Sequence, residues 1–268
     1  MSEEIGRREI QLPRIPEKVT EPYRLYLEDF HRLQHFVGFI SSLATDVDRK
    51  AVVAAQALLE TIEYETDREE KQRAYRKMIE EKGVGALKTL REFRQLILQA
   101  MVCRGVDNFL TYISQLLSLI FRTKPETLRS NDQIKVDFAL QHTTMNDLVD
   151  ALAEKKVTDL SYSGMRQLAD YIRDRLGLEL FADESALERA IFLIEVRNLI
   201  THNRSVVNDT FLNKLRASKE PVGKIGETLN LEVDSVFDGI TFLADTVGQI
   251  DWRAASKFGL PQPHTYQK

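Results

Sequence analysis

The sequence predicts an all-α fold. Twelve glycines and seven prolines make up 19 of 268 residues, roughly 7% where about 12% is usual, and this shortage of turn formers favours long helices over a sandwich or barrel. Apolar residues also recur at three- and four-residue spacing through several long segments, as on the buried face of an amphipathic helix. The exception is a possible small β-hairpin near 221–231, where turn residues flank a short alternation.

The first part of the chain is expected to form an arm followed by a helical extension. Residues 1–20 contain Pro13 and Pro16 and show no sustained period, which indicates an extended arm. Apolar spacing predicts one helix from Pro22 to about Ala44 and a second from about Asp46 into the charge-dense stretch 63–82. We assign 21–82 to an N-terminal helical extension that folds separately, with a domain boundary at Gly83–Gly85.

The remaining chain is expected to form the main helical domain, 86–250, and a tail, 251–268. Residues 86–122 are strongly apolar and predict two helices meeting near Gly105, or one long kinked helix. Further helices are expected over 132–154, 163–176, 185–203 and about 232–249, the third opened by a capping box of Ser185 and Glu188. The apolar excess of 86–122 also predicts a homodimer interface.

Composition excludes several classes of protein. Lys and Arg number 37 against 41 Asp and Glu, a net charge of −4, so a nucleic-acid partner needs a local basic patch. The single cysteine, Cys103, excludes an internal disulfide and a zinc or iron–sulfur cage built from cysteines. The amino terminus shows no secretory signal, and the apolar run 109–121 is too short and too interrupted to span a membrane. We expect a cytoplasmic protein without membrane association, cofactor or bound metal.

Residues 187–208 are the segment most informative about function. Leu187, Ile191 and Ile194 define one stripe of a helix, and its continuation places Asn198 near the stripe centre. Arg197 and His202 lie on either side of that centre, about 140° apart. Because polar groups are costly to bury without partners, this arrangement predicts a pocket or an interface rather than plain core. The carboxyl end of a helix also favours a protonated histidine, which suits acid–base chemistry.

The run Arg197-Asn198-Leu199-Ile200-Thr201-His202 resembles the Arg-x4-6-His signature of the HEPN superfamily (higher eukaryotes and prokaryotes nucleotide-binding). The resemblance covers about residues 105–217, with Asp107 matching an acidic residue often found on an early helix, and with Ser205 where many relatives have glycine. It implies an all-α bundle and a metal-independent ribonuclease that works as a homodimer, with two motifs facing each other across the two-fold axis.

The same resemblance implies roles for individual side chains. His202 would transfer protons, Arg197 would hold the phosphate, and Asn198 would orient His202 or the phosphate. Over 185–224 there are seven basic and four acidic residues, and the RNA contacts expected there are Arg204, Asn203, Lys214 and Arg216. The family also implies a role in toxin–antitoxin systems, stress or antiviral defence, with an antitoxin or another defence protein as a possible partner.

The sequence also allows other hypotheses about function. Some HEPN relatives have lost catalysis, so the chain is alternatively an inactive homodimer that scaffolds or regulates a partner protein. A third hypothesis is metal binding by His31 and His35 with Glu28, although the sequence lacks the H-E-x-x-H pattern and an exposed pair is favoured. The run 223–226, Gly-Lys-Ile-Gly, lacks the G-K-[ST] of a phosphate loop and predicts a turn.

Overall fold

A computed structural model describes residues 18–61, 69–73, 76–77, 85–129, 133, 135–215 and 223–265. It confirms the all-α fold. The elements are β1 (Lys18–Val19), α1 (Glu21–Thr61), α3 (Gly85–Glu92), α4 (Arg94–Thr123), η2 (Pro125–Leu128), α5 (Val136–Ala139), α6 (Met145–Tyr162), α7 (Met165–Tyr171), η3 (Ile172–Leu176), α8 (Glu184–Asn203), α9 (Asp209–Lys214), α10 (Val233–Phe258) and β2 (His264–Thr265).

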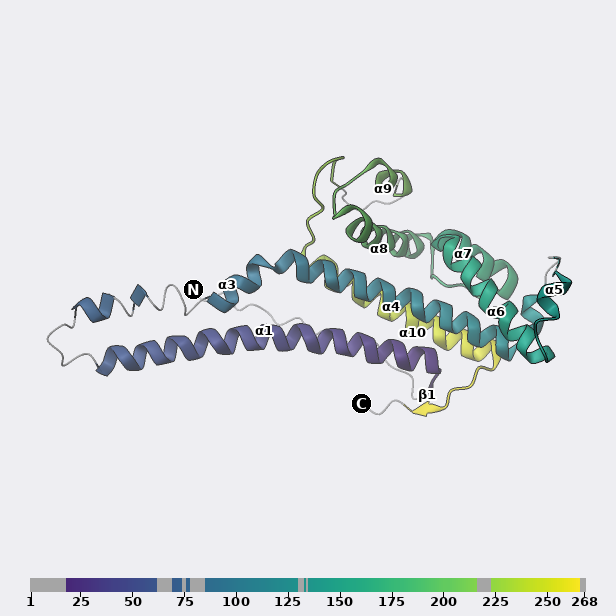
Figure 1. Ribbon diagram of the computed structural model, residues 1–268, viewed down its shortest axis with the longest axis horizontal. Helices are drawn as coiled ribbons and strands as arrows, with labels where there is room; N and C mark the ends of the chain where they lie inside the picture. The colour runs from purple at the N-terminus through teal and green to yellow at the C-terminus, as the bar shows by residue number, and fades with distance from the viewer. Residues whose placement is uncertain are drawn as a thin grey trace.

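Helix α4 is the centre of the molecule and contacts α1, α6, α8 and α10 (Figure 1). It runs unbroken through Gly105, where a Cβ would lie 3.2 Å from Ile240 Cγ1 of α10, and the break expected there falls instead at Phe93, before α4. Most apolar side chains of α4 are buried within the chain itself. The apolar residues from Leu98 onward are therefore used inside the fold, whereas Phe93 and Leu96 are 53% and 61% exposed, and the homodimer stays a prediction.

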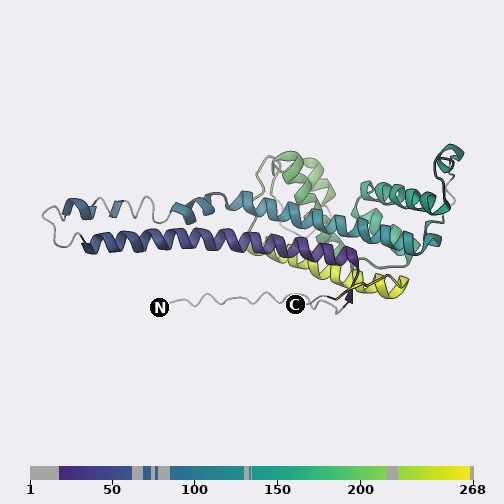
Figure 2. The same cartoon turned by 60° about the horizontal axis from the view of Figure 1, so that its bottom comes forward.

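Helix α1 is one continuous helix of 41 residues, and not two helices separated near residue 45. The amino-terminal part buries Tyr23, Tyr26 and Leu27 in the same core as α4 and α10. The carboxyl-terminal half extends beyond the body of the molecule alongside α3 (Figure 2). The buried part of α1 thus shares the common core, while residues 62–68, 74–75 and 78–82 of the extension expected over 21–82 lie outside the described residues.

The two ends of the described chain pair with each other, while residues 1–17 of the expected arm and 266–268 of the expected tail lie outside the described residues. β1 pairs antiparallel with β2, with Lys18 opposite Thr265 and Val19 opposite His264. Helix α10 continues nine residues beyond the expected end at 249, because apolar residues keep their helical spacing to Phe258. Gly259, with φ of 63°, then ends the helix in the left-handed conformation that glycine adopts easily.

The helices between residues 132 and 203 also begin at other residues than expected. A turn and the short α5 replace the first part of 132–154, and α6 opens with a capping box of Thr144 and Asp147. Ser185 and Glu188 do not form the capping box expected for α8. Asp183 caps that helix by accepting from the Ala186 N–H at 2.8 Å, and Glu188 pairs with Arg166 instead.

The described part of the expected hairpin, 223–231, forms a turn and pairs with another segment. The Glu227 N–H donates to the Lys224 carbonyl at 3.0 Å, which closes the turn predicted for Gly223–Gly226. Thr228 then forms an isolated bridge with Val206, just after α8, rather than with a second strand of its own. In the part of the chain that the structure describes, no helix combines the length and apolar character needed to cross a membrane.

Candidate functional site

Helix α8 carries the Arg197–His202 motif and packs one face against the core. The buried residues on this helix are Leu187, Ala190, Leu193, Val196 and Leu199. The sequence predicted a buried stripe through Ile191, Ile194 and Asn198, but the side chains of these three residues are only half-buried. The observed buried stripe lies to one side of them. Arg197 and Asn198 therefore lie beside the core and line the edge of a cleft, and they are not part of the core.

Arg197 is held by a contact between two helices. Its Nε donates to Asp107 Oδ1 on α4 at 2.9 Å, and its Nη2 lies 2.8 Å from the same oxygen. Its Nη1 donates to Asn198 Oδ1 at 3.1 Å. Each terminal nitrogen of an arginine carries two N–H bonds, so these contacts leave both Nη1 and Nη2 able to donate to a phosphate oxygen.

Asn198 consequently orients Arg197, whereas the sequence suggested that it orients His202 or the phosphate. His202 is exposed on the last turn of α8, about 7.5 Å along the helix from Arg197 and 140° around its axis. It is not among the residues that line the cleft, and it makes no hydrogen bond or ion pair with other described residues. A single chain therefore does not bring Arg197 and His202 to one point.

The turn after α8 fixes the direction of the motif's last residues. Arg204 and Ser205 have φ of 50° and 63°, in the left-handed region, and the Ser205 N–H donates to the Leu199 carbonyl at 3.1 Å. Asn203 donates through its side-chain amide to the Val206 carbonyl. The left-handed backbone gives a physical reason for glycine at the position of Ser205 in many HEPN proteins.

The residues expected to contact RNA differ in exposure and in their hydrogen bonds. Arg204 is exposed, while the side chain of Asn203 is engaged in holding the turn. Lys214 on α9 lies at the cleft and donates to both carboxylate oxygens of Glu195 at 3.0 Å. Arg216 lies outside the described residues.

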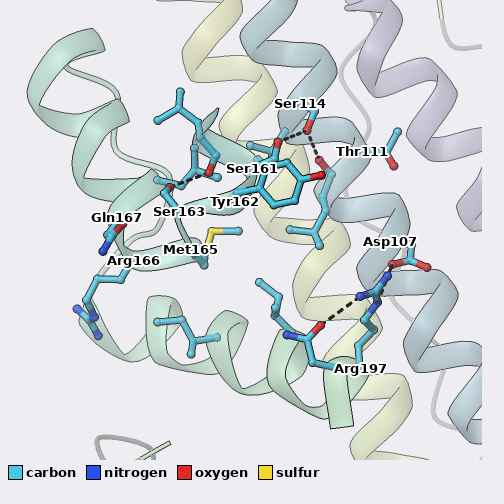
Figure 3. Close-up of a pocket in the computed structure, with 18 of the residues that line it drawn as sticks. Asp107, Thr111, Ser114, Ser161, Tyr162, Ser163, Met165, Arg166, Gln167 and Arg197 are labelled. Carbon is cyan, nitrogen blue, oxygen red and sulfur yellow. Dashed lines mark hydrogen bonds and ion pairs between the residues drawn. The ribbon is translucent and has the colours of Figure 1, made fainter. Parts of the chain in front are cut away.

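A cleft of about 1040 Å³ lies between α4, α8 and the junction of α6 with α7. Asp107 and Arg197 lie at one end (Figure 3), with Asn198 bonded to Arg197, and Lys214 also lines the cleft. At the other end are Thr111, Ser114, Ser161, Tyr162 and Ser163, which we call the serine end. The sequence analysis missed these five residues, although the run Ser161-Tyr162-Ser163-Gly164 between two helices was a visible signal for a polar loop.

The histidines on α1 have surroundings that do not favour a metal site. Glu28, one turn before His31 and His35, is bound to Arg24. Burial, and then the neighbouring His35, lower the pKa of His31. Among the described residues, no group of three or more His, Cys, Asp or Glu side chains is arranged to hold a metal ion.

Comparisons with protein-family models, curated proteins and solved structures find no match to this chain. The likeness to HEPN proteins therefore stays a resemblance carried by residues 197–202 and Asp107.

Proposed function

We propose that the chain is a metal-independent endoribonuclease that cleaves RNA through its 2′-hydroxyl, with Arg197 and His202 as catalytic residues. The observation that supports this most is the Asp107–Arg197–Asn198 contact at one end of a large cleft. It joins Asp107, Arg197 and Asn198, which the HEPN resemblance selected together with His202, although Asp107 and Arg197 lie 90 positions apart. It also leaves both terminal nitrogens of Arg197 able to donate to a phosphate.

The chemistry assigns a task to each residue. Cleavage requires removal of the 2′-hydroxyl proton, attack of that oxygen on the phosphorus, and protonation of the departing 5′-oxygen, which leaves a 2′,3′-cyclic phosphate and a free 5′-hydroxyl. An imidazole has one nitrogen that can accept a proton and one that can donate it, so His202 is suited to both proton transfers. Arg197 stabilises the negative charge that develops on the phosphate oxygens.

The proposed site combines residues from two copies of the chain in a homodimer. Because Arg197 and His202 point about 140° apart on α8, His202 of one copy would act with Arg197 of the other across a two-fold axis. Exposed Arg204 and cleft-lining Lys214 would attract the RNA backbone. The resemblance further suggests a cytoplasmic role in toxin–antitoxin, stress or antiviral systems, with an antitoxin or defence partner that restrains activity.

The test is cleavage of a labelled RNA pool in EDTA. Replacing His202 with Ala should lower the rate by about 10²- to 10⁴-fold because proton transfer is lost, and Arg197→Ala should cause a loss of about 10²- to 10³-fold. Arg253→Ala is the matched control, since Arg253 lies outside this cleft, and it should cleave normally. Equal cleavage by wild type and a folded His202→Ala variant would assign the activity to a contaminant.

A second function is favoured by the position of His202 outside the cleft lining. If both copies keep this arrangement, the protein is an inactive HEPN-like homodimer that scaffolds or regulates a partner. Light scattering at micromolar concentration, together with the cleavage assay, separates the two functions. A dimer that cleaves no RNA, tRNA included, supports the scaffold, and a strict monomer removes the composite site.

A further inference from the structure

The serine end of the cleft has an exposed aromatic ring. Tyr162, the last residue of α6, is 88% exposed, whereas Tyr23, Tyr26 and Tyr112 are buried in the core. The ring stands at the cleft beside Ser161 and Ser163 (Figure 3). An aromatic side chain in that position contributes little to the core and offers a face on which a planar ligand can stack.

The hydroxyl groups around Tyr162 are arranged to accept hydrogen bonds. Ser161 donates to the Val157 carbonyl at 2.8 Å, Ser163 to the Leu160 carbonyl at 2.7 Å, and Ser114 to the Leu110 carbonyl at 3.0 Å. The Ser114 and Ser161 hydroxyls also lie 3.4 Å apart, where either can donate to the other. Each serine has one O–H to donate, so an oxygen whose O–H is given to a carbonyl has only acceptor capacity left. A ligand at the serine end should therefore bring donors, such as the amino groups of a base or the hydroxyl groups of a ribose.

Charge differs between the two ends of the cleft. Asp107 and Arg197 lie at the first end, and Lys214 and Glu195, which also line the cleft, bind each other. At the serine end the cleft-lining Arg166 is engaged by Glu184 at 2.7 Å and by Glu188. The two ends thus suit a ligand with an anionic group at one side and an uncharged, donor-rich aromatic group at the other, which is the chemistry of a nucleotide.

The spacing of the two ends fits that ligand. Asp107 and Ser114 lie seven residues apart on α4, both facing the cleft, and the helical rise places them about 10 Å apart. Asp107 contacts Arg197 and Ser114 lies beside Ser161, the residue before Tyr162, so a ligand that joins the two ends spans about this length. The cleft volume of about 1040 Å³ also exceeds what a single base requires.

We propose that the serine end is a base-binding subsite for single-stranded RNA, in which a base stacks on Tyr162 beside the phosphate held at Arg197. This inference rests on the proposed ribonuclease function, which supplies the RNA and the position of the phosphate. Tyr162 acts as a substrate-binding residue. It binds substrate without transferring a proton.

The experiment measures binding separately from cleavage. A fluorescein-labelled single-stranded RNA decamer of mixed sequence is titrated with the full-length His202→Ala protein, and anisotropy gives the dissociation constant. Adding Tyr162→Ala should weaken binding by about 5- to 150-fold, the range for loss of one stacked base. Tyr162→Phe keeps the aromatic face and should bind within about twofold of the parent. Trp252→Ala is the matched control, because Trp252 is 61% exposed on α10 away from this cleft.

The outcomes distinguish this inference from the function on which it rests. If wild type cleaves RNA and Tyr162→Ala binds the decamer as tightly as the parent, the subsite is wrong and the ribonuclease stands. If the decamer binds through Tyr162 but wild type cleaves nothing, the subsite stands and the ribonuclease is wrong. Equal weakening by Tyr162→Ala and Trp252→Ala, or no binding by the parent, overturns the subsite.

Discussion

At the scale of single residues, Asp251 on α10 shows how one buried carboxylate joins distant parts of the chain. Its side chain is fully buried and accepts from the Thr20 hydroxyl at 2.5 Å and from the Tyr112 hydroxyl at 3.2 Å. Burial raises the pKa of Asp251 above its ordinary value, against the opposing effect of these hydrogen bonds. The carboxylate thus connects the segment before α1 with α4 and α10.

This raised pKa predicts a pH dependence of stability. Below about pH 4 Asp251 is protonated in both folded and unfolded chains. As the pH rises towards the folded pKa, Asp251 releases its proton in the unfolded chain before it does so in the folded chain. Wild type therefore becomes less stable, whereas Asp251→Asn has no carboxyl group at this position and is not affected. The free energy of unfolding of Asp251→Asn minus that of wild type should therefore increase by up to about 1.4 kcal/mol per pH unit over that window. Urea unfolding between pH 4 and 8 measures it, and parallel profiles would contradict the assignment.

At the scale of elements, Asp48 caps a helix that begins 37 residues later. Its carboxylate is 5% exposed and accepts from the backbone N–H groups of Ala86 and Leu87 at 3.0 and 2.9 Å. Asp48→Ala should therefore lower the free energy of unfolding by about 1–2 kcal/mol, and hydrogen exchange should accelerate in α3. Asp46→Ala, which removes only an exposed pair with Arg49, should change it by less than about 0.5 kcal/mol. Equal effects of the two substitutions would mean that the cap does not stabilise α3.

The same contact explains why some boundaries could not be predicted. Asp48 and Ser185 both have side chains that commonly precede helices, yet Asp48 lies inside α1 and Asp183 rather than Ser185 caps α8. Apolar periodicity identified most helical segments because that signal is local. Which polar side chain caps which helix depends on tertiary contacts, so the starts and ends of α1, α6 and α8 differ from expectation.

At the scale of the whole molecule, the core extends from α1 to α10, and removal of residues 1–82 tests its unity. Tyr23, Tyr26 and Tyr112 contact one another through their rings, and Thr20 binds Asp251. The fragment 83–268 should therefore lose its cooperative urea transition and its near-ultraviolet circular dichroism, in contrast to the separately folded bundle that the sequence suggested. A sharp unfolding transition of this fragment would show that the helical domain folds alone.

The sequence by itself determined the all-α class, most helical segments and the spacing of Arg197, Asn198 and His202 on one helix. These features follow from the 3.6-residue period, which acts within a few turns of chain. Tertiary structure decided that Asp107 holds Arg197, that His202 does not line the cleft, and that Tyr162 stands at the other end of the cleft. The cleft exists only where α4, α8 and the α6–α7 junction meet, because side-chain packing between segments far apart in sequence has no local period to reveal it.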